Sequence, residues 1–138
     1  MTYFVDTNVF LRAILQDDKS KGDECVSFLE KIKLNRIDAV TSHLVLAEMV
    51  WTLARSYRAT KKEIVRAAKS VVNLRGLKLE DSYDLNLALP WFETKGVKFV
   101  DCLLASCEKL ASKVWVIVSY DGEFDKLGVV RKEPGEVK

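Results

Sequence analysis

The chain has 138 residues, of which 49% are hydrophobic and 30% charged, and its net charge is +2. These values predict one soluble domain over 1–138 that is large enough to bury a core. The apolar runs are too short to cross a membrane, and the small net charge does not by itself indicate a polyanionic partner.

The cysteines predict a reduced, cytoplasmic protein. They are odd in number and form no CxxC pair: Cys25, Cys102 and Cys107. The amino-terminal segment enters an apolar strand pattern without a basic region or a cleavage site, which argues against secretion.

The first elements are an expected strand and two helices. The apolar run Tyr3–Val5 predicts the strand, and Thr7 or Asn8 is expected to cap a short helix that ends near Leu15. The spacing of apolar residues over 20–33 indicates an amphipathic helix.

A second strand and two capped helices follow. Residues 37–41 predict the strand, and Ser42 is a good N-cap for a helix that runs to about Tyr57. Thr60 and Glu63 have the spacing of a capping box at the start of the next helix.

The middle of the chain predicts a short strand between two helices. Gly76 is expected to end the helix that begins after Thr60, and 77–79 predict the strand. Asp81 or Ser82 then starts a helix that Pro90 is expected to kink or divide.

The last part predicts one helix and up to two strands. Gly96 ends the preceding helix, and 101–111 predict another. Residues 114–118 read as a buried parallel strand, and 129–130 as an edge strand after a helical turn at 123–126. Alternating strands and helices predict a three-layer α/β/α fold with a central parallel sheet of four to five strands.

Four acidic residues are the candidate catalytic centre. Asp6 ends the first strand and Asp121 follows the 114–118 strand, so both belong at the carboxyl edge of a parallel sheet. Glu48 interrupts an apolar helical pattern, and Asp101 lies at a helix start. Crowded carboxylates repel one another, and Mg²⁺ or Mn²⁺ would relieve that repulsion with the oxygen ligands these ions prefer.

Each acid also has a purely structural interpretation. Asp6 is a suitable helix cap, Asp101 complements a helix dipole, and Asp121 suits a turn beside a glycine. Glu48 could face solvent, although its apolar neighbours make a buried partner more attractive. Two further residues could support a metal site or simply cap local backbone: Asn8 and Ser119.

Together these residues resemble the PIN-domain nucleases, especially the VapC-type toxins of toxin–antitoxin pairs. The resemblance covers about residues 3–130, nearly the whole chain. Its motifs are Val5-Asp6-Thr7-Asn8, Leu46-Ala47-Glu48, Phe99-Val100-Asp101-Cys102-Leu103-Leu104-Ala105 and Ser119-Tyr120-Asp121-Gly122-Glu123-Phe124. Cys102 stands where the family usually has Ala, and Ser119 where it has Thr.

The resemblance implies a metal-dependent endoribonuclease. Asp6, Glu48 and Asp101 match the core metal ligands of the family, and Asp121 matches its fourth acid. Bound Mg²⁺ or Mn²⁺ would activate water and stabilise charge on the phosphate. The resemblance also implies a cognate antitoxin and a homodimer.

Basic and aromatic residues are weaker candidates. Basic side chains that could grip the RNA backbone are Arg12, Lys19, Lys21, Arg55 and Arg58. The basic stretch 55–75 equally suits a solvated helix face. Trp51, Trp91 and Phe92 are expected to fill the core, or in part to form the dimer contact.

Other functions stay open at this level. Asp6-Thr7-Asn8 resembles the Asp-x-Asp motif of haloacid-dehalogenase-like phosphatases, but Asn8 cannot serve as their second carboxyl group. A non-catalytic RNA-binding or scaffold module and an RNA-processing nuclease are further alternatives. His43 is the only histidine, so a covalent mechanism through a Cys–His or Ser–His–Asp arrangement has weak support.

Overall fold

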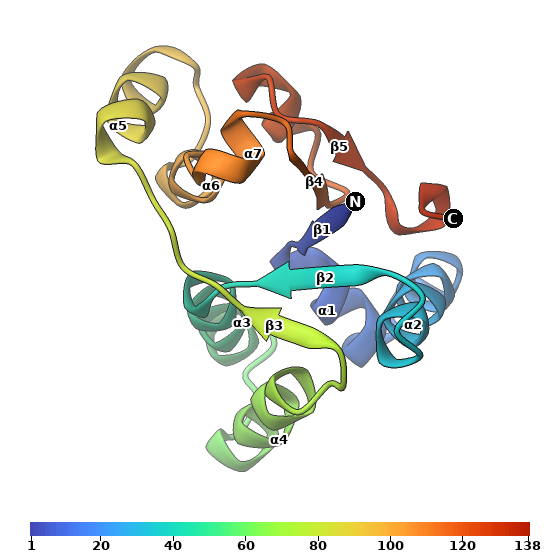
Figure 1. Cartoon of the computed structure of the whole chain (residues 1–138). Coiled ribbons are helices and arrows are strands. Elements are labelled where there is room, and N and C mark those ends of the chain that lie inside the picture. Colours follow the sequence, from blue (N-terminus) through green and yellow to red (C-terminus); the bar gives the residue numbers. More distant parts are fainter.

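The computed structural model describes all residues, 1–138, as a parallel sheet between two layers of helices (Figure 1). The strands are β1 (Thr2–Val5), β2 (Asp38–Thr41), β3 (Leu77–Leu79), β4 (Trp115–Val118) and β5 (Arg131–Lys132), in the order β3-β2-β1-β4-β5. Every pair is parallel. The expected fold class is therefore confirmed, with five strands.

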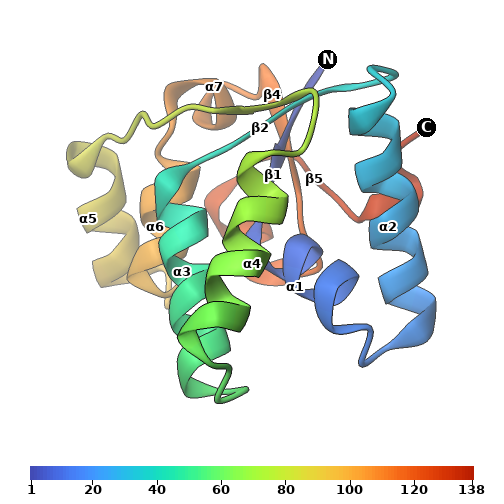
Figure 2. The ribbon, with the colours of Figure 1, turned by 90° about the horizontal axis from the view of Figure 1, so that it is seen from below.

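The first layer contains the amino-terminal helices: α1 (Thr7–Leu15), α2 (Lys19–Lys33), α3 (His43–Arg55) and α4 (Lys61–Val72). Figure 2 shows α3 and α4 side by side, with α1 between them and α2. The other face carries α5 (Leu85–Thr94), α6 (Phe99–Ala105) and α7 (Glu108–Ala111). Two 3₁₀ helices, η1 (Gly122–Leu127) and η2 (Pro134–Glu136), complete the chain.

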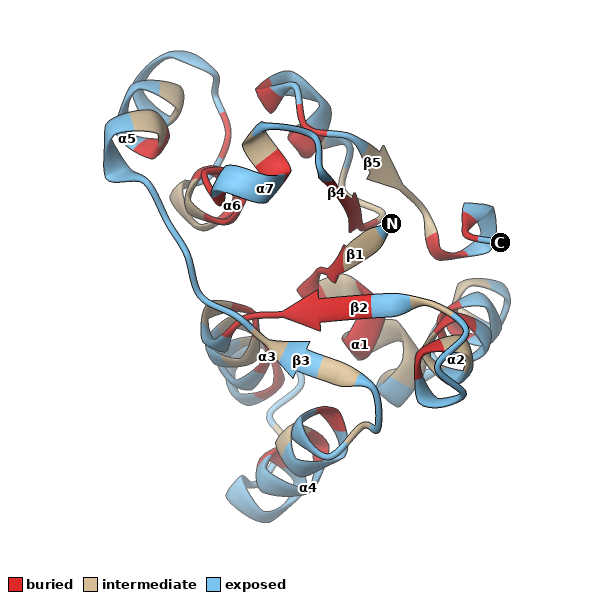
Figure 3. Cartoon of the chain, viewed as in Figure 1, coloured by how far each residue is buried: buried red, intermediate tan, exposed pale blue.

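The core lies between the sheet and its helices, as the buried residues in Figure 3 show. Every residue of β4 is buried, as expected for a strand covered on both faces. Cys25, Phe28 and Ile32 of α2 are buried at the predicted helical spacing, and all three cysteines are free and buried. No helix is both long and apolar enough to cross a membrane.

Two predicted caps are confirmed, and for α1 the structural alternative considered for Asp6 is the one observed. Ser42 accepts from the Val45 backbone N–H, and Thr60 and Glu63 form the reciprocal capping box. The cap of α1, however, is Asp6, not Thr7 or Asn8: its side chain accepts from the Thr7 backbone N–H. The strand therefore ends directly in the cap, with no intervening loop residue.

Several predicted helix limits are wrong because local hydrogen bonds end or start the helices elsewhere. α4 ends at Val72, and Gly76 (φ +88°) lies in the turn before β3, where a side chain would meet the Ile32 carbonyl oxygen. α5 begins at Leu85 with Asp84 as its cap, rather than at Asp81 or Ser82. Pro90 lies within α5 without dividing it.

The expected 101–111 helix is two helices. α6 begins before Asp101, at Phe99, and ends at Ala105, while α7 starts only at Glu108. At the break, the Ser106 hydroxyl donates to the Leu103 carbonyl oxygen and accepts from the Asp84 N–H. α6 thus stops where the Ser106 side chain bonds to Asp84, the cap of α5.

The remaining differences concern edges and exposed faces. The fifth strand is 131–132, not 129–130, and buried Val129 packs into the core before it. Two of the three aromatic residues expected in the core are exposed: Trp51 and Phe92. Trp91 does pack against the core.

Candidate functional site

The four predicted acids converge at the carboxyl edge of the sheet. Asp6 follows β1 and Asp121 lies shortly after β4, and these strands are neighbours. Glu48 comes from α3 in one helix layer, and Asp101 from α6 in the other. Asp6, Glu48 and Asp121 line a cavity of about 140 Å³ together with Thr7, Asn8, Leu11, Thr52 and Lys98.

Asp6 is buried and held by three donors. Its Oδ1 accepts from the Thr7 backbone N–H at 2.8 Å. Its Oδ2 accepts from the Ser119 hydroxyl at 2.7 Å and from the Asn8 amide at 3.3 Å. Burial raises the pKa of Asp6 to about 6, against the lowering effect of the bonds from Ser119 and Thr7. The three hydrogen bonds therefore fix the orientation of the carboxylate, but none of them comes from a positively charged group.

Ser119 and Asn8 tie the ends of β1 and β4 together. The buried Ser119 hydroxyl accepts from the Asn8 amide and from the Asp121 backbone N–H, both at 3.0 Å. The Asn8 side-chain oxygen accepts from the Tyr120 N–H. The Asn8 amide group therefore orients Asp6. The second carboxyl group of the phosphatase motif has a different role, which is to transfer a proton.

Glu48 is half-buried and held by two donors. The Thr7 hydroxyl donates to Oε1 at 2.6 Å, and the Lys98 ammonium donates to Oε2 at 3.1 Å. The expectation that this carboxylate needs partners within an apolar helix is met by these two groups. Sequence reasoning did not assign either of them to Glu48.

Asp101 is a buried carboxylate whose negative charge is only partly compensated. Its side chain is only 2% exposed, and Oδ2 is buried without a hydrogen-bond partner. Burial, followed by repulsion from Asp6, raises the pKa of Asp101 to about 8, although Lys98 lowers it. An unpaired buried carboxylate oxygen facing other acids is the arrangement that a cation would stabilise.

The acids fit a hard divalent metal in chemical type, because all the available donors are oxygen atoms. As the side chains lie, however, no three of the acidic, histidine or cysteine groups are close enough to hold one ion together. The ammonium of Lys98 lies between two of the acids, 3.1 Å from Glu48 and 3.9 Å from Asp101. The edge of the sheet that carries the four acids, here called the acidic rim, therefore has more negative than positive charge, and the Lys98 ammonium lies within it.

The basic candidates lie outside this cluster. Arg12 pairs with Asp18 at 3.7 Å and lies over the Tyr120 ring, which Lys21 also contacts. Lys19 pairs with Asp23 on its own helix. Arg55 stacks on Trp51, and Arg58 is exposed in a left-handed backbone conformation. None of these side chains forms an ion pair with the four acids.

The roles of Lys98 and Thr7 as partners of Glu48 are what sequence reasoning missed. Lys98 precedes Asp101 by one helical turn, a spacing at which side chains meet, and Thr7 directly follows Asp6. The spacing of Lys98 and Asp101 and the threonine after Asp6 are visible in the sequence, but both features are common at helix starts. The contact of each with Glu48 depends on α3, which no local pattern reveals.

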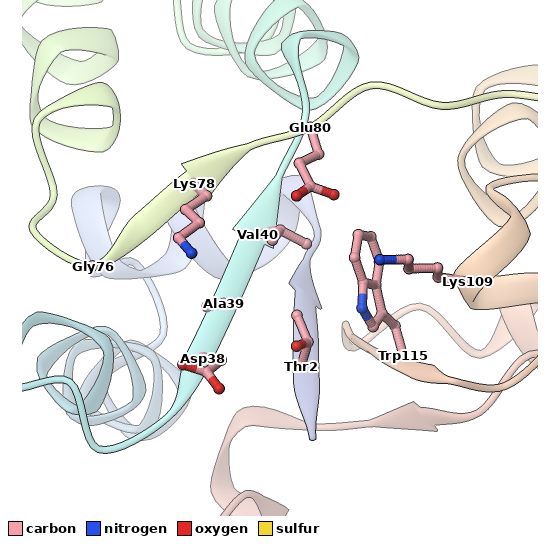
Figure 4. Close-up of a pocket in the computed structure, with 9 residues that line it drawn as sticks. All are labelled: Thr2, Asp38, Ala39, Val40, Gly76, Lys78, Glu80, Lys109 and Trp115. Carbon is pink, nitrogen blue, oxygen red and sulfur yellow. The ribbon is translucent and has the colours of Figure 1, made fainter.

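Another cavity lies away from the acids. It has a volume of about 250 Å³ and shares no lining residue with the acidic one. Figure 4 shows side chains along β1, β2 and β3 on one side of it, and Trp115 of β4 and Lys109 of α7 on the other. Two lysines and two acids line it, and Lys109 lies over the Trp115 ring. Its charges balance, and none of its lining side chains has a buried polar atom without a partner.

His43 does not support a covalent mechanism. Its Nδ1 lies 2.5 Å from Asp81 Oδ2, and its backbone N–H also bonds to Asp81. No hydrogen bond joins its ring to a serine or a cysteine. The pair fastens the segment after β3 to the start of α3.

A parallel three-layer fold with an acidic rim defines a class of α/β proteins whose site lies at the carboxyl ends of the strands. The PIN domain family matches residues 3–130 of the sequence. The chain therefore belongs to the PIN domain family, which confirms the resemblance seen in its motifs.

Solved structures agree with this fold. The structure of VapBC2 from Rickettsia felis bound to a DNA fragment from its promoter superimposes with a TM-score of 0.66, at 22% identity, over 96% of this chain and 98% of that chain. PAE2754 from Pyrobaculum aerophilum gives a TM-score of 0.61, at 22% identity, over 95% and 83%. The sequence matches none of the curated proteins with which it was compared.

Proposed function

We propose that this protein is a metal-dependent endoribonuclease and the toxin of a toxin–antitoxin pair. The observation that carries the proposal is the convergence of Asp6, Glu48, Asp101 and Asp121 at one edge of the sheet, with a buried, unpartnered oxygen on Asp101. A purely structural role would leave such a carboxylate without a reason to be buried. The whole of 1–138 would act as one nuclease domain.

In this proposal Asp6, Glu48 and Asp101 hold Mg²⁺ or Mn²⁺, and Asp121 completes the acidic set. The metal, when bound, supplies an activated water molecule and stabilises negative charge on the phosphate. Ser119, Asn8 and Thr7 keep Asp6 and Glu48 in fixed orientations through the hydrogen bonds given above. Their role is to orient the ligands before the ion and the RNA arrive.

The family supports the proposed substrate and partners. Single-stranded or structured RNA would approach the acidic rim, and Arg12, Arg55 and Arg58 are the candidates for binding its backbone. The VapBC2 complex supports a cognate antitoxin as the neutralising partner. The free, buried cysteines suit the reducing cytoplasm.

Exposed apolar side chains support a homodimer. Those on α3 and α5 are Val50, Trp51, Leu85, Leu89 and Phe92. Single exposed apolar residues are common on protein surfaces, but groups of them indicate an interaction site. We assign the residues on α3 and α5 to the contact between two copies of the chain.

The proposal is tested with the purified protein, total RNA and Mn²⁺ or Mg²⁺. The wild type should cleave RNA internally, and a chelator should stop the reaction. Asp6→Asn should abolish cleavage without loss of thermal stability. Cleavage by Asp6→Asn at the wild-type rate would refute the assigned mechanism, and absence of cleavage by the wild type would favour the scaffold alternative.

A further inference from the structure

The ammonium of Lys98 occupies the part of the acidic rim where a cation is needed. It lies 3.1 Å from Glu48 Oε2 and 3.9 Å from Asp101 Oδ1. Glu48 belongs to α3, whereas Lys98 and Asp101 belong to the start of α6. One side chain thus neutralises acids from both helix layers.

Removing this charge would leave the acids facing one another. Like charges repel one another strongly where a protein surface lowers the effective dielectric below that of water. Asp101 already has one oxygen without a partner, and Glu48 has only the Thr7 hydroxyl besides Lys98. Burial disfavours the charged form of Lys98, but Asp101 and Glu48 outweigh it and raise its pKa.

The lysine is the movable member of the cluster. Its side chain is 59% exposed, compared with 15% for Glu48 and 2% for Asp101. The ammonium makes no hydrogen bond other than the one to Glu48. The ammonium can therefore move into solvent while the acids stay in place, because the acids are fixed by buried elements and the lysine is not.

We propose that Lys98 is a built-in counter-ion of the metal-free site, which a divalent metal must displace in order to bind. This inference rests on the proposed metal-dependent function and adds a positioning residue to it. In the metal-free protein Lys98 holds Glu48 and Asp101 near each other. Because the lysine and the metal interact with the same oxygens, every binding event includes the loss of the lysine contacts.

The test measures Mn²⁺ binding by titration calorimetry at pH 8.5, with the whole chain as wild type, Lys98→Gln and Lys98→Arg. The control is Lys95→Gln, because Lys95 is an exposed neighbour with no ion pair and its loss changes the net charge equally. Lys98→Gln should bind Mn²⁺ about tenfold more tightly or better, since the competing charge is gone. Lys98→Arg and Lys95→Gln should stay within about twofold of the wild type.

A second measurement follows thermal unfolding with a chelator and with Mn²⁺. With the chelator, Lys98→Gln should have a Tm about 3 °C or more below that of Lys95→Gln, because its acids lack a counter-ion. With Mn²⁺ its Tm should rise more than that of the wild type. These two shifts do not depend on RNA cleavage.

The outcomes separate this inference from the proposed function. If the wild type binds Mn²⁺ and Lys98→Gln binds it equally or more weakly, the counter-ion role is refuted while the metal-dependent function stands. If the wild type binds no Mn²⁺, the proposed function fails and the displacement with it.

Discussion

The Ser119 hydroxyl donates to Asp6 Oδ2 at 2.7 Å, although 113 positions separate the two residues. The Ser119 hydroxyl oxygen in turn accepts from the Asn8 amide and from the Asp121 backbone N–H. One buried hydroxyl therefore uses its single donor and both acceptor positions to join two strand ends beside the acids.

Ser119→Ala should lower both stability and metal affinity. The Asp121 N–H and the Asn8 amide lose their acceptor, which costs about 1–3 kcal/mol, and the pKa of Asp6 should rise because Ser119 lowers it. Thermal unfolding and Mn²⁺ titration measure the two effects. Ser119→Thr, which keeps the hydroxyl, is the control; an alanine variant with wild-type metal affinity would show that Ser119 does not orient Asp6.

Asp101→Asn should remove cleavage while leaving the metal-free protein as stable as the wild type or more stable. The substitution replaces a buried carboxylate whose pKa is raised to about 8 with a neutral group of the same shape. RNA cleavage should fall by about a thousandfold, on the scale expected when a group essential to catalysis is lost. A marked drop in Tm without metal would instead indicate a structural role for Asp101.

The stability of the metal-free protein should fall as the pH rises from about 4 to about 8. Both Asp6 and Asp101 have folded-state pKa values above the ordinary value of 3.8, so the folded chain binds more protons than the unfolded chain in this window. Stability therefore decreases with pH until both are ionised. Denaturant unfolding with a chelator at several pH values measures this; replacing Asp6 and Asp101 together with Asn should flatten the dependence.

Over the same window the apparent Mn²⁺ affinity should increase, because binding must release the protons held by Asp6 and Asp101. Calorimetry in two buffers with different ionisation enthalpies counts the protons released. Equal heats in both buffers near pH 6 would contradict this coupling.

Thr7→Val should weaken metal binding with little change in fold. The Thr7 hydroxyl donates to Glu48 Oε1 at 2.6 Å, and valine has nearly the same shape without that donor. Freed from one partner, Glu48 should hold the ion less well, and cleavage should fall by about tenfold. Thr7→Ser, which retains the hydroxyl, should behave like the wild type in the same cleavage assay.

Leu89→Glu should convert the expected homodimer to a monomer. Leu89 is 52% exposed on α5, and a carboxylate there would have to be buried between the two copies. Light scattering coupled to gel filtration measures the mass. Val65→Glu, at a 51% exposed site on α4, is the matched control and should leave the mass unchanged; a dimer in both variants would exclude α5 from the contact.

Local sequence patterns were sufficient for most of the fold. Buried strands such as β4 consist of β-branched and aromatic residues, and the caps Ser42 and Thr60 bond to backbone within their own helices. Such features need no distant partner, so the sequence displays them. The wrong limits of α5 and α6 arise where Ser106 bonds across to Asp84, a contact between elements.

The sequence by itself determined the alternation of elements, because strand and helix positions follow from periodicity, and it marked Asp6, Glu48, Asp101 and Asp121 as candidate site residues. Only the tertiary structure decided that Thr7 and Lys98 are the partners of Glu48, and that Trp51 and Phe92 face outward. Those facts depend on how helices from two layers meet at one edge of the sheet. Charges and hydroxyls acquire partners there only after the sheet has brought distant segments together.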